Sequence, residues 1–362
     1  MVRNVAVMLA LLGAGPLPAA LAGDVDMFVA RYRTDEVFRF DGRTGERLGV
    51  FAALENIATG CVGPDGLLYF IQYGRNSRIW KFDGGEGVLV REALLYATAL
   101  CLTPDGNLLV CHDSGTIIKL DRNTGRGIDT FEPAPRAIGN LTFGPDGKLY
   151  ATDPLYDRIF HWDGHTGAFL GEFTRGGGLD APGTLAFGPD GHLYVASANR
   201  VLRYDSLTKQ LLGVFIDGRR AGINVGPSIA FGPDANLYVA STPGVWRFNG
   251  ASGQLIDRFT HLKYPGQILF RPPDGVECDR IKRFRTRCKN GLLTCIIRSD
   301  LPEGTRVHVR NNDETSFARV DARGRGKVRF ENQTNEPHNV SIPWCRGIAC
   351  PLLRCEGDKC RD

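Results

Sequence analysis

The sequence predicts an all-β protein: a six-bladed β-propeller followed by a small Ig-like β-sandwich with a Cys-rich tail. Three observations predict it. A turn phrase recurs at a nearly constant interval, each interval holds four short strands, and after Val276 the repeat gives way to a segment with seven of the ten cysteines. We expect the propeller over residues 24–276, the sandwich over 277–343 and the tail over 344–362.

The repeated phrase is Gly-Pro-Asp-Gly, with small changes from one copy to the next. Successive copies are 40, 41, 44, 44 and 40 residues apart, which is the length of one four-stranded propeller blade. Proline fixes φ, aspartate tolerates the corner and glycine accepts positive φ, so the phrase predicts a tight turn. Its aspartates are Asp65, Asp105, Asp146, Asp190, Asp234 and Asp274.

One unit illustrates the pattern. Short strands are predicted at 140–143, 149–152, 158–162 and 168–173, with turns between them. The first unit, Met27 to Phe51, lacks the strand and turn phrase that should precede it, and the last, Gln267 to Gly275, has nothing after its turn. The N-terminal strands are therefore expected to complete the last blade, which removes an open sheet edge and gives six blades.

The phrase Gly188-Pro189-Asp190-Gly191-His192-Leu193-Tyr194, followed by Val201-Leu202-Arg203-Tyr204-Asp205, resembles the NHL-type repeat, and the resemblance covers roughly residues 26–275. Propellers of this type include lyases, lactonases, sugar dehydrogenases and binding platforms. Similarity to gluconolactonases would imply Glu, Asn and Asp on the axis holding calcium or zinc. Similarity to streptogramin lyases would imply seven blades and more than one catalytic histidine.

Alignment of the blades gives two sets of inner polar positions, which predict a wet central channel. The fifth position of the second strand, counted from the Leu of the Leu-Tyr pair as the first, gives a ring with no glutamate and one histidine: Arg31, Gln72, His112, Asp153, Ser197 and Ser241. The second set lies near the start of the first strands: Thr59, Ala99, Asn140, Thr184, Ser228 and Gln267.

The first ring suggests chemistry at the channel mouth. His112 and Asp153 could form an acid/base pair, and Arg31 could bind an anionic group, which makes these three the candidate catalytic residues. With Asp113, the histidine and aspartate could instead hold a divalent cation. All of them could also be ordinary polar strand ends, and no metal ligand set is assigned. The candidate ligand-binding residues are Gln72, Asp113, Asn140, Ser197, Ser241 and Gln267.

The other histidines of the repeat, His161, His165 and His192, are expected at the surface. Cys101 and Cys111 are expected nearly opposite each other in one hairpin, either bridged or, like Cys61, simply buried. The tail cysteines Cys345, Cys350, Cys355 and Cys360 stand five apart, which suits disulfides with Cys278, Cys288 and Cys295 better than zinc.

The N-terminus predicts export. Arg3, the apolar run from Val5 to Leu12 and Ala20-Leu21-Ala22 match a secretory signal over residues 1–23, and no later run is long enough to span a membrane. Residues 277–362 hold 18 Lys and Arg against 12 Asp and Glu, a formal charge of +6. This basic part is either a solvated sheet face or a surface for an acidic glycan, a membrane or nucleic acid, and export argues against nucleic acid.

Together these features favour a secreted propeller that binds an extracellular or envelope protein or glycan. The rival is a lyase or hydrolase that acts at the channel mouth. A third reading is an assembly subunit joined through an unpaired cysteine. An enzyme should gather its polar side chains around one small volume, whereas a binding platform should expose an aromatic or apolar patch on one face.

Overall fold

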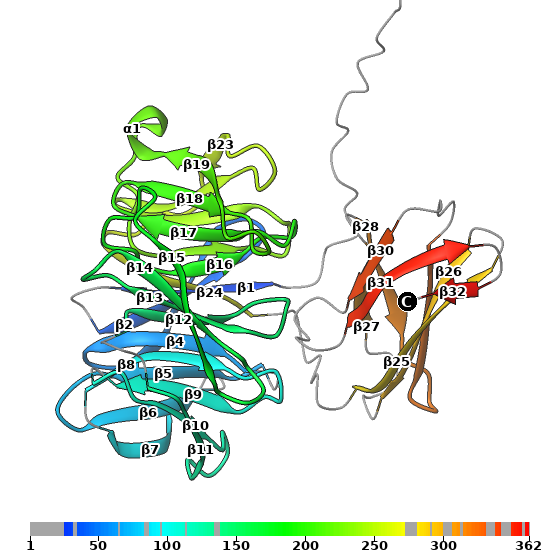
Figure 1. Cartoon of the computed structure of the whole chain (residues 1–362), viewed down its shortest axis with the longest axis horizontal. Coiled ribbons are helices and arrows are strands. Elements are labelled where there is room, and N and C mark those ends of the chain that lie inside the picture. Colours follow the sequence, from blue (N-terminus) through cyan, green and yellow to red (C-terminus); the bar gives the residue numbers. More distant parts are fainter. Residues whose placement is uncertain are drawn as a thin grey trace, which may run out of the picture.

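The computed structural model describes an all-β chain with a propeller-like fold, and Figure 1 shows its four-stranded sheets beside the strands of the C-terminal part. Within the described residues the one helix is α1 (Gly218–Ala221), capped by the Asp217 side chain. The described residues are 25–31, 35–63, 66–82, 87–94, 96–112, 114–133, 138–271, 281–289, 292–299, 306–311, 314–330, 337–341, 349–356 and 359–361. The predicted signal over 1–23 lies outside them.

Six four-stranded antiparallel sheets lie between Asp26 and Arg271 in the described part of the chain. The unit predicted over 140–173 is confirmed as β12 to β15. From first to fourth strand, the sheets are β24 (Pro265–Arg271), β1 (Asp26–Arg31), β2 (Glu36–Asp41) and β3 (Arg47–Ala53); β4 (Ile57–Val62), β5 (Leu68–Gln72), β6 (Ser77–Phe82) and β7 (Val88–Leu94); β8 (Ala97–Leu102), β9 (Leu108–His112), β10 (Ile117–Leu120) and β11 (Gly127–Phe131); β12 (Asn140–Phe143), β13 (Leu149–Asp153), β14 (Arg158–Trp162) and β15 (Phe169–Arg175); β16 (Leu185–Phe187), β17 (Leu193–Ser197), β18 (Arg200–Tyr204) and β19 (Leu211–Asp217); and β20 (Ile229–Phe231), β21 (Leu237–Ser241), β22 (Gly244–Phe248) and β23 (Leu255–Arg258).

The two ends of the repeat meet in one sheet, as the sequence predicts. β1 pairs antiparallel with β24, so that Met27 lies opposite Phe270. The buried carboxylate of Asp26 accepts hydrogen bonds from Arg39 on β2, at 2.8 Å, and from Arg271 on β24. One carboxylate thus joins three strands from opposite ends of the repeat region.

Polar side chains on, or directly before, four first strands reach the backbone of the next first strand, and we call these contacts the side-chain staples. Each staple ends one residue beyond the equivalent position in the next sheet. The equivalent positions on β4 and β8 are Thr59, whose buried Oγ1 has no partner among the described residues, and Ala99, which has no polar side-chain atom. The staples are Asn140 Oδ1 accepting from Leu185 N (3.2 Å), Thr184 Oγ1 from Ile229 N (2.8 Å), Ser228 Oγ from Ile268 N (3.1 Å), and Gln267, whose Nε2 donates to Gly60 O (2.7 Å) and whose Oε1 accepts from Gly60 N.

The aspartate of the turn phrase anchors the tyrosine of the second strand. Tyr194 donates its hydroxyl hydrogen to Asp190 at 2.8 Å, and Arg203, opposite that tyrosine on the third strand, lies 3.9 Å from the same carboxylate. The arrangement recurs with Tyr238 and Asp234, at 3.0 Å. The turn phrase and the Leu-Tyr pair are therefore two halves of one contact, which explains why they recur together.

In the sheet of β12 to β15, a histidine stands opposite the tyrosine, at the position that Arg203 occupies in the next sheet. His161 lies opposite Tyr150, which donates to Asp146 at 2.9 Å. The expected surface position of His161 is wrong, because the residue is 5% exposed and its ring stacks on Tyr150. Its Nδ1 lies 3.1 Å from Gly171 O and its Nε2 lies 3.4 Å from Lys209 Nζ, which suits a neutral ring that donates from Nδ1.

Burial, and next the positive charge of Lys209, lower the pKa of His161 from its usual 6.5. Near pH 6.5 and below, His161 therefore binds a proton more readily in the unfolded chain than in the folded one. We expect stability to fall as the pH drops below 6.5, by at most about 1.4 kcal/mol per pH unit for one proton. Urea unfolding of the wild type and His161→Gln at several pH values measures this.

The acid-dependent loss should shrink in His161→Gln and persist in His165→Gln, a matched variant at an exposed histidine. Lys148, Lys209 and Asp146 also face the ring, and the lysines oppose its protonation while the aspartate favours it. An identical pH profile in wild type and His161→Gln would contradict this assignment.

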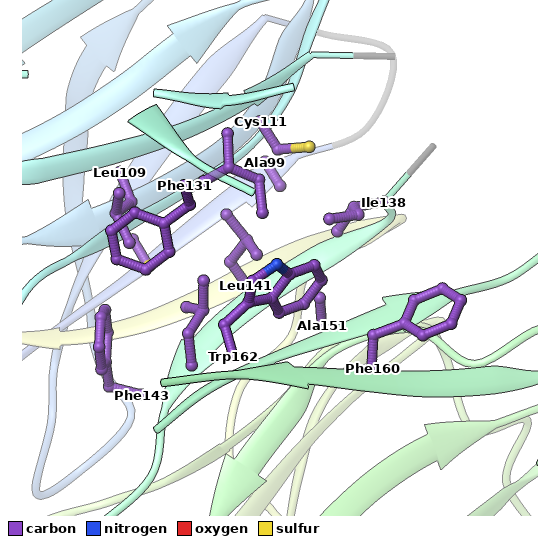
Figure 2. Packing of buried hydrophobic residues seen from close by; sticks show 13 residues of the cluster. Ala99, Leu109, Cys111, Phe131, Ile138, Leu141, Phe143, Ala151, Phe160 and Trp162 are labelled. Carbon is purple, nitrogen blue, oxygen red and sulfur yellow. The ribbon is translucent and has the colours of Figure 1, made fainter. Parts of the chain in front are cut away.

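The core lies between neighbouring sheets. Figure 2 shows the cluster shared by the sheets β8–β11 and β12–β15, in which Trp162 lies among Leu109, Phe131 and Leu141. Trp162 is fully buried, and its Nε1 donates to Glu132 O at 2.9 Å. Large side chains thus fill the space between sheets, while one backbone oxygen satisfies the indole.

Cys101 and Cys111 belong to this same cluster. Their predicted near-opposite placement is wrong, because Cys101 lies opposite Leu109 and Cys111 lies opposite Ala99. Both are buried, and Cys111 donates from Sγ to His112 O at 3.2 Å. They act as small side chains of the core.

The fourth strands form the outer edges of the sheets. All six show a break in register against their third strands. On β3, β15 and β19 a glycine with positive φ, namely Gly49, Gly171 or Gly213, lies next to the break. Such bulges twist an edge strand away from regular pairing and protect edges that expose apolar residues such as Leu48 and Val50.

The C-terminal part forms two further sheets. The predicted hairpin around Asn290-Gly291 is confirmed as β25 and β26. Within the predicted Cys-rich tail, β31 pairs with β30 in the second sheet. No described residues form a helix long and apolar enough to cross a membrane. In sheet order the strands are β25 (Ile281–Lys289), β26 (Leu292–Ser299) and β29 (Arg325–Phe330), then β28 (Glu314–Arg319), β27 (Arg306–Asn311), β30 (Pro337–Ser341), β31 (Ala349–Glu356) and β32 (Lys359–Arg361).

Candidate functional site

The predicted ring residues share one structural position. Each is the last residue of a second strand, and we call the side of the sheets on which these strands end the ring face. Because the strands of a sheet are antiparallel, the connections that lead into the first strands lie on this face too. The ring residues are Arg31, Gln72, His112, Asp153, Ser197 and Ser241, on β1, β5, β9, β13, β17 and β21.

Two of the ring residues are held by neighbours in their own part of the fold. Arg31 donates from Nε to Lys263 O at 3.1 Å and pairs with Glu36 at 3.6 Å. Gln72 accepts a hydrogen bond from Trp80 Nε1 at 3.1 Å. The arginine thus already has an anionic partner, and the glutamine satisfies an indole.

Three more ring residues are buried. Asp153 is fully buried, and its Oδ1 accepts from the backbone nitrogens of Leu155 and Tyr156, at 3.1 and 3.2 Å. Its Oδ2 has no hydrogen-bond partner within the described chain. Ser197 accepts from Asp180 N at 2.8 Å. Ser241 is 2% exposed, and its Oγ likewise has no partner there.

His112 and Asp153, the predicted acid/base pair, enter different spaces between sheets. Successive side chains of a strand alternate between its faces. His112 shares a face with Val110, which packs in the cluster formed with β5, whereas Asp153 shares a face with Ala151, which packs against β9. The sheet that carries His112 lies between these two spaces.

Of the other candidate residues, Asn140 and Gln267 form side-chain staples, which gives them a structural role. Asp113, one of the three residues of the predicted cation site with His112 and Asp153, lies outside the described residues. Across the described ranges, no three His, Cys, Asp or Glu side chains gather closely enough to hold a metal ion.

The ring face exposes a set of large side chains that the sequence alignment missed. They lie in the connections that follow the second strands or precede the first strands, and they are between 38% and 75% exposed. The signal was present, since each stands within three residues of a ring position or directly before a first strand. The set, which we call the tyrosine patch, is Tyr73, Tyr96, Leu155, Tyr156 and Tyr264.

Within the tyrosine patch, Tyr73 and Tyr96 lie with ring centroids 6.0 Å apart. Tyr96 and Tyr264 have φ angles of 45° and 56°, a left-handed conformation that bulky side chains rarely adopt. Asn56, directly before β4, takes the same conformation (φ 52°), and asparagine adopts it far more readily. Such strain persists where the surroundings enforce it, and it is concentrated at sites that hold ligands.

Comparisons with known proteins support the fold and leave the activity open. No family model matches the chain, and none of the curated proteins does. A solved structure of a protein of unknown function from Bacteroides caccae is similar, with a TM-score of 0.54 and 14% identity over 68% of this chain and 99% of the other. At that identity the likeness concerns the fold alone.

Proposed function

We propose that the chain is a secreted, NHL-type propeller of six blades that binds a partner protein through the tyrosine patch, with an Ig-like C-terminal sandwich. Six sheets match the six turn phrases of the sequence. Each first strand contacts the first strand of the next sheet, and β24 contacts both β20 and β4, which supports a closed ring. The N-terminal signal pattern supports export.

The observation that carries the binding function is the tyrosine patch. Tyrosine offers a large rigid ring with a polar tip, and it is enriched where proteins bind one another. The four tyrosines and one leucine of the patch lie exposed in connections of one face, where a partner can reach them. The strained backbone at Tyr96 and Tyr264 points in the same direction, because folding alone would favour asparagine or glycine there.

The rival lyase or hydrolase function finds less support. A catalytic arginine must be available to its substrate, and Arg31 is already engaged by Glu36 and Lys263 O. His112 and Asp153 enter different spaces between sheets. The ring residues therefore serve mainly to satisfy hydrogen bonds at strand ends and turns, and the exposed side chains around them supply the recognition surface.

Photo-cross-linking tests the proposal. A benzoylphenylalanine at position 96 or, as a matched control, at His165 on the opposite side of the sheets is introduced into the full chain in the producing cells. We expect protein adducts from position 96 that are lost when Tyr73→Ala and Tyr264→Ala are added, and none from position 165. Adducts at both positions, or at neither, would overturn the proposal.

A second variant separates binding from folding. Tyr96→Asn places a residue suited to φ 45° at this position, which relieves backbone strain of about 1 kcal/mol. The variant should unfold at the same or higher urea concentration and yet compete poorly with wild type for the cross-linked partner. A variant that folds and competes as well as wild type would remove Tyr96 from the binding surface.

A further inference from the structure

The three-stranded sheet of the C-terminal part carries charges of a single sign. Its strands β25, β26 and β29 contain nine Lys and Arg residues and no Asp or Glu. The propeller-like region shows no such bias, because residues 1–276 hold 26 Lys and Arg against 28 Asp and Glu. The positive charge of the chain is therefore concentrated on one element of the fold.

The register of these strands sets the cations side by side on one face. Arg298 on β26 lies directly between Arg283 on β25 and Arg325 on β29. In the next row Arg285 and Lys327 flank Ile296. We call this surface the cationic face; its six members, all exposed, are Arg283, Arg285, Arg298, Arg325, Lys327 and Arg329.

The opposite face of the same sheet is the apolar one. Leu293, Cys295 and Ile297 alternate with the outward side chains of β26, and all three are fully buried. A Cβ on Gly326 of β29 would come within 3.1 Å of Ala318 on β28, so the second sheet packs closely against this side. Packing thus directs the cations outward, away from the core.

Directly opposed like charges destabilise a sheet, so folding alone does not explain this arrangement. Among the ion pairs of the described residues, one involves a member of the cationic face. It joins Arg325 to Asp321 at 3.7 Å, and both side chains are solvent-exposed. A ligand with closely spaced negative groups would relieve the repulsion between Arg283, Arg298 and Arg325.

We propose that the cationic face is a second binding site, distinct from the tyrosine patch, and that it binds an acidic polysaccharide. Five of its six cations are arginine, whose planar guanidinium matches carboxylate or sulfate oxygens in pairs. Neighbouring strands lie about 4.8 Å apart, so a row of arginines can meet successive anionic groups of one extended polymer.

Two other polyanions fit the surface less well. Single-stranded nucleic acid binds on aromatic platforms, and the described positions of this face between the cations are Ile296 and Thr294. Stable attachment to a bilayer usually requires apolar side chains that insert into it as well as basic charges. The apolar side chain between the cations, Ile296, is only partly exposed. Both remain as arms of the test.

The test measures binding of the full chain to immobilised polygalacturonate and heparin at increasing salt. We expect binding whose logarithmic salt slope falls by about one for each cation removed. The variant Arg285→Thr/Arg298→Thr/Lys327→Thr should bind about tenfold more weakly or worse, and its thermal midpoint should stay equal or rise because repulsion is relieved.

A control variant removes the same charge elsewhere, through Arg43→Thr, Arg91→Thr and Arg126→Thr at exposed positions of the propeller-like region. It should bind the polysaccharides almost as wild type does, and so should Tyr96→Asn, which keeps this test separate from that of the tyrosine patch. Equal binding by the cationic-face variant, or tighter binding to single-stranded DNA or to phosphatidylglycerol vesicles than to polygalacturonate and heparin, would overturn the proposal.

Discussion

Replacing Gln267 with alanine is expected to lower the free energy of unfolding by about 2–4 kcal/mol. The amide of Gln267 donates to Gly60 O at 2.7 Å and accepts from Gly60 N, so it satisfies both backbone groups of one buried residue. Without it, a buried donor and a buried acceptor lose their partners, and each costs about 1–3 kcal/mol. The contact also joins β24 to β4, so the loss should loosen the junction between these sheets.

Urea unfolding measures the stability, and hydrogen exchange at the Gly60 amide reports the junction directly. Gln254→Ala is the matched control, because Gln254 is an exposed glutamine of the same region and its side chain forms no staple. It should change stability by less than about 0.5 kcal/mol. If Gly60 exchanges as slowly in Gln267→Ala as in the wild type, the amide does not hold the junction.

Trp162→Ala is expected to cost more, about 3–5 kcal/mol, because it removes the largest fully buried side chain among the described residues. Its indole fills the space between two sheets, as Figure 2 shows, and contacts Phe169 at a centroid distance of 5.2 Å. The cavity would open between sheets, where neither can collapse without moving its strands.

Trp162→Phe separates volume from hydrogen bonding. It keeps most of the apolar surface but leaves Glu132 O without the indole hydrogen, so its effect should be smaller than that of the alanine variant. Thermal and urea unfolding give both values. Equal losses for the two variants would mean that the hydrogen bond, and not the buried ring, dominates at this position.

The sheets could be predicted from the sequence because the repeat combines three local signals. The Pro-Asp turn phrase marks the hairpin between the first and second strands of five sheets, and alternating apolar residues mark the strands. In three sheets the tyrosine that the turn aspartate anchors stands four residues later, as Asp190 and Tyr194 show. The unmatched ends of the repeat predicted the pairing of β1 with β24. In the C-terminal part, Asn290-Gly291 predicted the hairpin of β25 and β26.

The site was harder to predict, because polarity at an inner position does not distinguish function from structure. Gln267 and Asn140 look like channel-lining ligands in sequence, yet each holds a neighbouring strand. His161 stands in an alternating strand and looks exposed, but it takes the position opposite tyrosine that Arg203 and Arg247 occupy in two other sheets, and it is buried there. The pattern that selects a ring position cannot reveal which atoms already have partners.

The tyrosine patch and the cationic face show the complementary difficulty. Tyr96 lies in a connection, where periodicity gives no guide to which side chains are exposed. The arginines of β25 were visible as alternating residues, but their alignment with Arg298 and Arg325 depends on the pairing of three strands across a long stretch of sequence. Register, and not composition, turns them into one surface.

The uneven distribution of the staples has a mechanical consequence. Four neighbouring pairs of sheets are joined by side-chain staples that start at β12, β16, β20 and β24. No staple joins β4 to β8 or β8 to β12, because the Oγ1 of Thr59 has no partner among the described residues and Ala99 has no polar side chain. Heat or force should therefore separate β8 from β4 and from β12 before it separates β1 from β24, where the two ends of the repeat region pair.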